Sequence, residues 1–277
     1  MSTYQEAVKS ATQRLEKAGI ENSAIDAWYL FAEVTGMTKT EYFLNATKEL
    51  EPELRKRYEE YVKQRLERIP MQYIIGEEEF MGLTFEVNEN VLIPRQDTEI
   101  LVELALQVSE DADVLDVCTG SGCIAISIAK LSSVRSMTAL DISEAALLTA
   151  TRNAKKNETD VMFIKSNMFE KITKKYDVIV SNPPYIPSKV VDTLMPEVKD
   201  HEPRLALDGT EDGLAFYRIL AEQAKNHLNL GGKVFFEIGC EQAADVCTLL
   251  RENGYDKIQV TKDYAGLDRV VSAIKAT

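Results

Sequence analysis

The chain has 277 residues, enough to bury a sizeable core in one large domain or two modest ones. Hydrophobic residues make up 45% and charged residues 28%, and the longest uncharged apolar run near a motif, 117–129, is too short and glycine-rich to span a bilayer. The chain has 32 basic and 45 acidic residues, so its net charge is −13, which disfavours duplex DNA as a substrate.

Helical periodicity fills the first 67 residues. Apolar residues recur at spacings of three and four, as on one face of a helix: Tyr4, Val8, Ala11, Leu15 and Ala18. No strand pattern interrupts this region. We therefore expect a small helical bundle over residues 1–68.

Capping signals divide the rest of this bundle into helices. A second helix is predicted over 23–34, with Gly36 as its stop signal. Thr38 and Glu41 form a candidate capping box for a short third helix. Pro52 at a first helical position starts a fourth, which runs to about residue 68.

The character of the sequence changes at Pro70. Residues 79–87 place a glycine between short β-prone runs, which predicts a β-hairpin in a linker over 69–90. Asp97 or Thr98 is then expected to cap a helix that runs through Val108.

From residue 114 onward, strands and helices alternate. The predicted strands are 114–118, 137–142, 161–165, 176–181, 233–238, 257–261 and 269–274, and the predicted helices are 123–131, 144–156, 214–228 and 242–253. Such repeats imply a doubly wound parallel sheet. The connection 262–268 is too short for a crossover helix, so the last two strands should pair antiparallel. A seven-stranded α/β sheet with one reversed strand at its end resembles the Rossmann-like class I methyltransferase architecture, here over 91–277.

A glycine-containing turn follows the first strand of this sheet. It reads Asp116-Val117-Cys118-Thr119-Gly120-Ser121-Gly122, and glycine allows the backbone to approach a ligand closely. Asp141 lies 19 residues after Gly122 at the end of the next strand, where a carboxylate can accept the hydroxyls of a ribose. These features serve NAD as well as S-adenosylmethionine, and a turn without any cofactor stays open. Asp116 favours the sulfonium cofactor, because a carboxylate there would repel a pyrophosphate.

The third strand is followed by Ser166-Asn167-Met168-Phe169. In this type of sheet that loop borders the adenine. Asn167 is expected to hydrogen-bond the adenine amino group and Met168 to pack on the ring; an ordinary strand-to-loop turn is the alternative. Together with Cys118, Ile142 and Asn182, these residues complete the predicted cofactor site.

The fourth strand, 176–181, runs directly into Asn182-Pro183-Pro184-Tyr185. Ligands bind at the carboxyl ends of such strands. Two prolines fix the backbone and remove two N–H groups, so the Pro183 carbonyl is left without a competing local donor. Together with the Asn182 side-chain carbonyl it offers two acceptors that match the two hydrogens of a planar –NH2 group. Tyr185 can pack on the flat face of the target, and a rigid proline turn without function is the alternative.

A delocalised amide or aromatic amine nitrogen is a poor nucleophile. Holding both of its hydrogens positions it for in-line attack on a methyl group. The methylated nitrogen then loses a proton readily, so no dedicated base is required. Asn182, Pro183, Pro184 and Tyr185 are therefore the candidate catalytic and target-binding residues, for either an amide or an adenine amino group.

Other features exclude further chemistry. The cysteines, Cys118, Cys123, Cys240 and Cys247, lie in apolar settings without CxxC spacing, and we expect them to be small buried hydrophobes. Neither histidine pairs with a cysteine at metal spacing, so no metal is expected. The N-terminus lacks the basic start and apolar centre of a signal peptide, which favours a cytoplasmic protein.

These residues resemble one known family over essentially the whole chain: the N(5)-glutamine methyltransferases of peptide chain release factors, often called HemK or PrmC proteins. The matching segments are 68–76, 80–85, 91–99, the glycine turn, 182–185, Glu202-Pro203, 206–209, 212–214 and 268–271. Two positions depart from the family pattern: Asn167 stands where aspartate is commoner, and Thr210 where glycine is commoner.

The resemblance implies an enzyme that uses S-adenosyl-L-methionine. Its target would be the glutamine of the Gly-Gly-Gln motif of class 1 peptide chain release factors, held by the Asn182 and Pro183 carbonyls. The N-terminal bundle would contact the release factor or merely stabilise the chain. We expect a monomer that contacts neither nucleic acid nor a membrane.

Three other functions are kept as alternatives. An adenine amino-group methyltransferase acting on nucleic acid would grip its target with the same four-residue motif, although the acidic charge disfavours it. An NAD-dependent oxidoreductase would need an acid or base near the nicotinamide, and neither histidine is obviously placed for that role. A cofactor-free adaptor would not bind S-adenosylmethionine at all.

Overall fold

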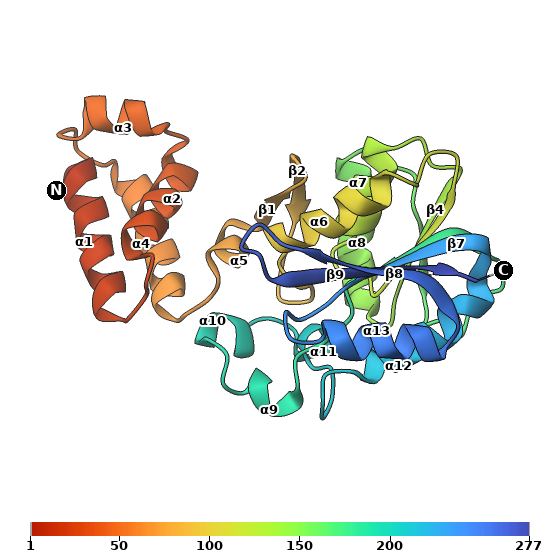
Figure 1. The fold of residues 1–277 in the computed structure, drawn as a ribbon. Coiled ribbons are helices and arrows are strands. Elements are labelled where there is room, and N and C mark those ends of the chain that lie inside the picture. Colours follow the sequence, from red (N-terminus) through yellow and green to blue (C-terminus); the bar gives the residue numbers. More distant parts are fainter. Residues whose placement is uncertain (1, 277) are drawn as a thin grey trace. The chain divides into compact units, whose positions relative to one another are not determined.

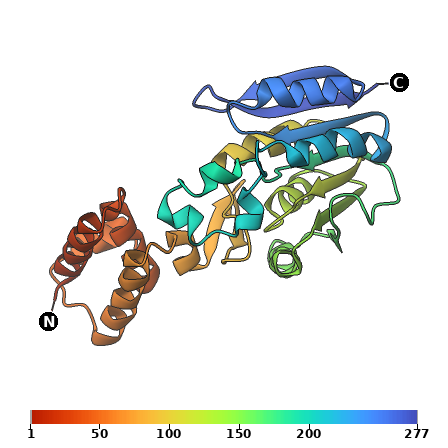
Figure 2. The same cartoon turned by 90° about the horizontal axis from the view of Figure 1, so that it is seen from below.

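The computed structural model describes residues 2–276, which form two compact units (Figures 1 and 2). The first unit runs to Gly76 and also includes Pro196–His201. The second comprises Glu77–Met195 and the residues from Glu202 onward. The division into 1–68, 69–90 and 91–277 assigned a role to each part of the chain. That assignment stays a prediction, because compactness alone gives a segment no role.

Helices of the first unit pack around aromatic side chains. In chain order they are α1 (Tyr4–Lys17), α2 (Ser23–Thr35), α3 (Lys39–Asn45), α4 (Pro52–Leu66) and α5 (Met71–Ile75). The ring of Phe31 lies 5.4 Å from that of Tyr4 and 5.5 Å from those of Tyr42 and Tyr58. The predicted capping box of Thr38 and Glu41 is confirmed at the start of α3. The expected bundle is therefore built on an aromatic centre.

A short helix from much later in the chain completes the first unit. It is α10 (Pro196–Lys199), whose buried Glu197 lies 2.9 Å from Arg65 and 2.8 Å from Arg68. Arg65 also pairs with the buried Asp26 at 2.8 Å. Buried charges are tolerated when they are paired in this way. No local pattern in residues 196–201 indicates that they belong to this unit.

The second unit begins with the predicted hairpin and helix. The hairpin consists of β1 (Glu77–Phe80) and β2 (Leu83–Glu86), and the helix is α6 (Gln96–Leu106). The expectation that Asp97 or Thr98 caps α6 is wrong, since Arg95 is the N-cap and makes no side-chain cap bond. Thr98 lies inside the helix and is buried, so its hydroxyl is available for tertiary contacts.

The predicted seven-stranded sheet is confirmed. Its order is β5-β4-β3-β6-β7-β9-β8, with β3 (Asp113–Val117), β4 (Ser136–Asp141), β5 (Met162–Lys165), β6 (Tyr176–Ser181), β7 (Leu228–Glu237), β8 (Tyr255–Lys262) and β9 (Asp268–Lys275). Strands β3 to β7 pair in parallel. The reversed strand is β9, which lies antiparallel between β7 and the edge strand β8.

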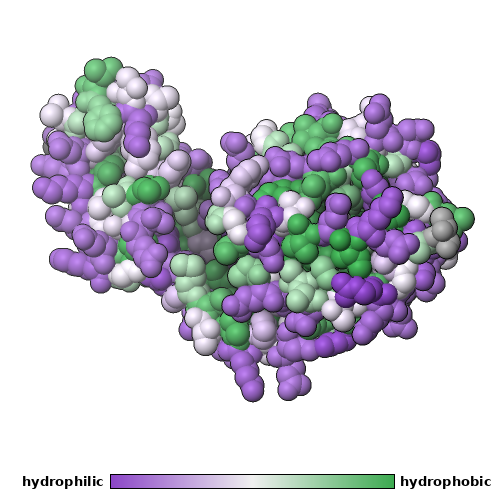
Figure 3. All heavy atoms as spheres, viewed as in Figure 1, coloured by the Kyte–Doolittle hydropathy of each residue, from purple (hydrophilic) through white to green (hydrophobic). Residues whose placement is uncertain are grey.

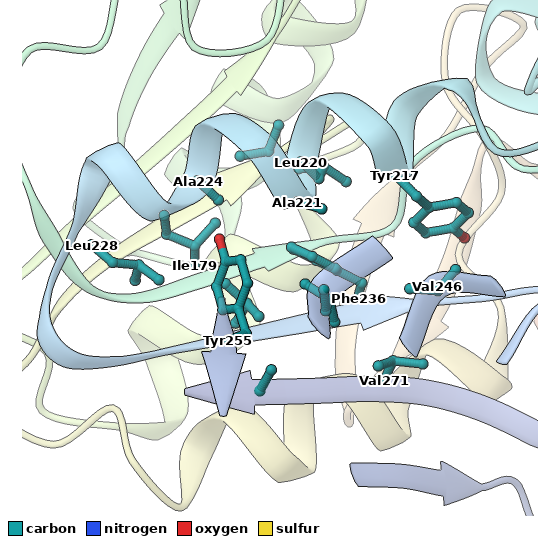
Figure 4. Packing of buried hydrophobic residues seen from close by; sticks show 14 of the residues in the cluster. Ile179, Tyr217, Leu220, Ala221, Ala224, Leu228, Phe236, Val246, Tyr255 and Val271 are labelled. Atoms are coloured by element: carbon teal, nitrogen blue, oxygen red, sulfur yellow. The ribbon is translucent and has the colours of Figure 1, made fainter. Parts of the chain in front are cut away.

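Helices cover both faces of this sheet, because successive strand residues point to opposite sides. One face packs against α12 (Ala215–Gln223) and α13 (Ala243–Glu252), as Figure 4 shows for Ile179, Tyr217, Leu220, Phe236, Val246 and Val271. The other packs against α6, α7 (Cys123–Leu131) and α8 (Glu144–Lys156), through Leu101, Val114, Ile126, Ala154 and Val178. The limits predicted for α7 and α8 are confirmed.

The remaining elements are short. They are α9 (Ser188–Val191) and α11 (Arg204–Leu207) after β6, and the 3-10 helix η1 (Ala224–His227), which replaces the last turn expected of the helix 214–228. The cysteines are free thiols; Cys123 is buried as expected, whereas Cys240 is exposed because it lies in the loop after β7. In residues 2–276 no helix is long and apolar enough to cross a membrane, and no cluster of three His, Cys, Asp or Glu side chains suits a metal ion.

Candidate active site

A cavity of about 240 Å³ opens where the parallel strands of the second unit end. Carboxyl ends of parallel strands meet at one edge of the sheet, so the loops after β3, β4, β5 and β6 come together there. Ten of the predicted site residues line the cavity: Cys118, Thr119, Gly120, Ser121, Asp141, Ile142, Asn167, Met168, Asn182 and Pro184. Of the other predicted residues, Asp116, Gly122, Pro183 and Tyr185 do not line it.

The turn after β3 is held together by Asp116. This carboxylate is fully buried, and the Thr119 hydroxyl donates to its Oδ2 across 2.6 Å. Burial raises the pKa of Asp116 to about 7, although the Thr119 hydrogen bond opposes that rise. The Asp116 side chain therefore stabilises the conformation of the turn. The attraction predicted between the Asp116 carboxylate and a sulfonium group stays a prediction.

Gly122 is required by backbone and packing together. Its φ is 83°, in the left-handed region that favours glycine. A Cβ there would lie 2.9 Å from the side chain of Ile126 and 3.1 Å from that of Ala150. Cys118 has a φ of 64°, which is uncommon for a residue with a side chain. The turn thus draws α7 close to α8 and places its backbone at the cavity wall.

Asp141 links the ends of β3 and β4. Its Oδ2 accepts the Gly120 N–H and its Oδ1 the Ser143 N–H, both at 2.9 Å. Each carboxylate oxygen has a second lone pair, so both remain able to accept a hydroxyl from a diol. Burial raises the pKa of this carboxyl, and the two backbone N–H groups counteract it. These two acceptor oxygens fit the hydroxyls of the S-adenosylmethionine ribose.

The loop after β5 supplies the predicted adenine contacts. The Asn167 amide donates to Glu170 across 2.8 Å, which turns its Oδ1 away from that carboxylate and leaves it as an acceptor. Met168 is buried, with its sulfur 4.0 Å from that of Cys118. A flexible thioether beside an amide acceptor fits an adenine ring with its amino group. The adenine roles of Asn167 and Met168 stay predictions.

The motif 182–185 enters the cavity wall from the end of β6. Pro183 and Pro184 are buried, and Asn182 and Tyr185 are half-buried. Among the described residues, no hydrogen-bond donor reaches Asn182 Oδ1 or the carbonyl oxygen of Pro183. Both predicted acceptors therefore lack a donor among the described residues, and their role toward a target –NH2 group stays a prediction.

Close backbone packing fixes this motif from the far side. A Cβ on Gly209 would lie 2.8 Å from Tyr185 Cα and 2.9 Å from the Pro184 carbonyl oxygen. At Gly213, with a φ of 74°, it would lie 2.3 Å from the Tyr185 carbonyl oxygen. Thr210 has a φ of 73°, which explains why glycine is the commoner residue there.

Sequence reasoning missed a polar cluster behind the motif. Asn182 Nδ2 donates to the Thr98 hydroxyl across 3.3 Å, and the Tyr185 hydroxyl donates to Glu237 across 3.5 Å. Glu237 ends β7 and is buried, which raises its pKa to about 7. Burial also raises the pKa of Tyr185. The position of Glu237 at the carboxyl end of a central strand was the signal that could have found it.

Sequence reasoning also missed an ion pair beside the cavity. Arg95 forms an ion pair with Glu202, which is buried and also accepts the Ile93 N–H across 3.3 Å. Arg95 and Pro203 both line the cavity. The segments 91–99 and 202–209, which are far apart in the sequence, therefore meet at one wall.

The chain is similar to known proteins in both sequence and fold. The PrmC N-terminal domain family matches residues 6–76, and the methyltransferase small domain family matches residues 95–201. A release factor glutamine methyltransferase of Fusobacterium nucleatum is 42% identical over 273 residues, 96% of this chain and 77% of that protein. One of Geobacter sulfurreducens is 39% identical over 259 residues, 93% of this chain and 91% of that protein. A methyltransferase structure from Pyrococcus furiosus, 21% identical, has a TM-score of 0.57 and covers 78% of this chain and 100% of its own, a likeness of fold.

Proposed function

The chain belongs to the release factor glutamine methyltransferases, and we propose that it methylates the side-chain amide nitrogen of the Gly-Gly-Gln glutamine in class 1 peptide chain release factors. Its methyl donor is S-adenosylmethionine. The identity of 42% and 39% with curated members extends over more than nine-tenths of the chain and supports this activity. The alternatives, an NAD oxidoreductase and an adaptor, are thereby set aside.

The observation that carries the target assignment is the pair of free acceptors in the motif. Asn182 Oδ1 and the Pro183 carbonyl oxygen have no donor among the described residues. A glutamine amide supplies two N–H donors in one plane, and one acceptor for each fixes its rotation. Held in this way, the nitrogen lone pair faces the cavity in which Asp141, Asn167 and Met168 would hold the cofactor.

The bound cofactor supplies an electrophilic methyl group on a sulfonium sulfur, which leaves as a neutral thioether. Asn182 and Pro183 raise electron density on the target nitrogen by accepting its hydrogens, and they favour the partly pyramidal geometry needed for attack. After transfer the nitrogen is strongly acidic and releases one proton to water. No general base is assigned to this chain.

A labelling experiment tests the activity. Purified protein, methyl-labelled S-adenosylmethionine and a class 1 release factor should yield label on the Gly-Gly-Gln glutamine. A release factor with that glutamine replaced by alanine should stay unlabelled. Label on another residue, or on added nucleic acid in place of the release factor, would overturn the assignment. Asn182→Ala should lose most of the rate, by about 100-fold or more.

We further propose that the first unit contacts the release factor away from its glutamine. Its α2 and α3 expose large apolar side chains, and Figure 3 shows hydrophobic surface over α3. The most exposed are Phe43 at 69% and Leu44 at 80%. Exposed apolar groups of this size are typical of a protein-binding surface. Because release factors act in translation, the enzyme is assigned to the cytoplasm, and we propose that it acts as a monomer.

A double variant separates this docking role from catalysis. Phe43→Ser with Leu44→Ser should raise KM for the intact release factor about 10-fold and leave turnover of a short Gly-Gly-Gln peptide unchanged. Leu230→Ser, at a residue of the second unit that is 75% exposed, is the matched control and should change neither. An unchanged KM for the intact factor would refute the contact.

A further inference from the structure

The side chain of Asn182 is useful to the target in only one orientation. With its oxygen toward the cavity it accepts a hydrogen from the target amide; reversed, it would present –NH2 to another –NH2. The two orientations have nearly the same shape, so packing discriminates poorly between them. A hydrogen-bond partner behind the amide must therefore select one.

Thr98 is that partner. Asn182 Nδ2 donates to its hydroxyl oxygen across 3.3 Å, and Thr98 is only 2% exposed. A threonine hydroxyl has one hydrogen and can accept through its lone pairs. If that hydrogen is committed elsewhere, Thr98 can only accept from Asn182, which then must offer its –NH2 end.

Glu237 provides the competing acceptor. Its carboxyl is 2% exposed, the Thr98 hydroxyl is among the groups that interact with it, and the Tyr185 hydroxyl donates to Oε1 across 3.5 Å. Oε2 is buried and has no hydrogen-bond partner in the described part of the chain, so it is an acceptor open to the Thr98 hydroxyl. A carboxylate has only lone pairs to offer, so it draws the single hydrogen of Thr98 toward itself.

We propose that Glu237 is a positioning residue that acts through Thr98 to hold the Asn182 amide with its oxygen toward the target nitrogen. The order of donation is Asn182 –NH2 to Thr98, and Thr98 O–H to Glu237. The inference rests on the proposed function, because the orientation matters only for a target that donates two hydrogens. Thr98 lines the cavity and Glu237 does not, and both act on the target through Asn182.

Protonation of Glu237 reverses this order. A protonated carboxyl donates to Thr98, whose own hydrogen then turns to Asn182 and favours the reversed amide. Burial raises the pKa of Glu237 to about 7, with Arg269 opposing and Asp97 adding to the rise. Titratable groups facing Glu237 come from several elements: Asp97, Cys123, Tyr185, Tyr217 and Arg269. The active order is therefore the one present above this pKa.

Substitutions at Thr98 and Glu237 test the relay in the full-length enzyme, with transfer to a release factor measured from pH 6 to 9. Wild type should lose rate as the pH falls below about 7. Thr98→Val should lower kcat about 10- to 100-fold, the usual penalty for misplacing one buried hydrogen bond. Thr98→Ser keeps the hydroxyl and should keep both rate and profile. Calorimetric affinity for S-adenosylmethionine should stay within about twofold in all variants, since neither residue is among the predicted cofactor contacts.

The outcomes separate the two proposals. A wild type that labels no release factor at any pH refutes the proposed function. A wild type that labels it while Thr98→Val retains full rate and the same profile refutes the relay. If Thr98→Val fails to bind cofactor, Glu237→Gln decides: the relay requires a reduced rate without the step near pH 7, and a retained step overturns it.

Discussion

The side-chain amide of Gln242 donates to the carbonyl oxygen of Tyr185 across 3.0 Å. The same nitrogen donates to the Gly213 carbonyl across 3.2 Å, while Gln242 Oε1 accepts the Gly239 N–H across 3.0 Å. One side chain, just after β7, thereby ties together the motif after β6, the segment beyond it and the β7 loop. The motif 182–185 is thus held by hydrogen bonds from a neighbouring loop as well as by its two prolines.

Gly213→Ala tests this support. The new Cβ would lie 2.3 Å from the Tyr185 carbonyl oxygen, so the backbone of the motif must shift. We expect transfer activity to fall about 100-fold, as ångström-scale misplacement of a target typically does. Gly231→Ala is the matched control, because it has the same φ of 74° with nothing within 4 Å of its Cβ. Equal rates for the two variants would show that strain in φ, and not contact with Tyr185, governs the result.

Asp141→Asn should weaken S-adenosylmethionine binding about 10- to 100-fold. The substitution removes a charged acceptor and turns one oxygen into a donor that faces either the Gly120 or the Ser143 N–H. Titration calorimetry measures the affinity. The control is Glu144→Gln, since this exposed neighbour pairs with Lys165 at 2.8 Å and the variant should bind the cofactor as wild type does. Unchanged affinity in Asp141→Asn would exclude the ribose contact.

Glu197→Gln should destabilise the first unit by about 2 to 4 kcal/mol, because it leaves Arg65 and Arg68 short of a buried anionic partner. Trp28, the single tryptophan, lies in α2 and reports unfolding of this unit by fluorescence in denaturant. Glu59→Gln breaks the exposed pair with Arg14 at 2.6 Å and should cost less than about 1 kcal/mol. Similar losses in both variants would contradict the assignment of α10 to this unit.

Glu237 should make the second unit less stable as the pH rises. Its pKa is about 7 in the folded chain against an ordinary 4.5, so the folded state binds the proton more tightly between these values. The stability that this proton contributes is complete below pH 4.5 and is lost as the pH rises through 7. Relative to wild type, Glu237→Gln should therefore gain about 3 kcal/mol between pH 5 and pH 8. Circular dichroism in denaturant at both pH values measures the change; a constant difference would refute the raised pKa.

The opposite sign is expected for Glu197. Burial alone would raise its pKa, but a backbone hydrogen bond together with Arg65 and Arg68 lowers it below the ordinary value. The stability it contributes is present above pH 4.5 and is lost as the pH falls through the lowered pKa. Fluorescence of Trp28 against pH should thus show the wild-type advantage over Glu197→Gln shrinking in acid.

Local sequence patterns predicted most elements of the fold. Strand β6 and helices α7 and α8 have the limits that periodicity predicts. An element that is buried on one face, or on all sides, shows this burial in the order of its apolar residues. The backbone of the motif 182–185 could likewise be predicted, since two prolines and a terminal strand residue constrain it locally. The cap of α6 was misread, because Thr98 has the composition of a cap residue and a tertiary role instead.

By itself, the sequence determined the sheet and the loops at its carboxyl edge. It predicted the cofactor contacts and the two acceptors of Asn182 and Pro183 from causes that lie within a few residues of one another. Only the tertiary structure decided what surrounds them: Thr98 and Glu237 behind the amide, Gln242 and Gly213 behind Tyr185, and Glu197 beside Arg65. The physical reason is that such partners are chosen by distance in space. Buried hydrogen bonds between residues more than 50 positions apart leave no periodic signal in the chain.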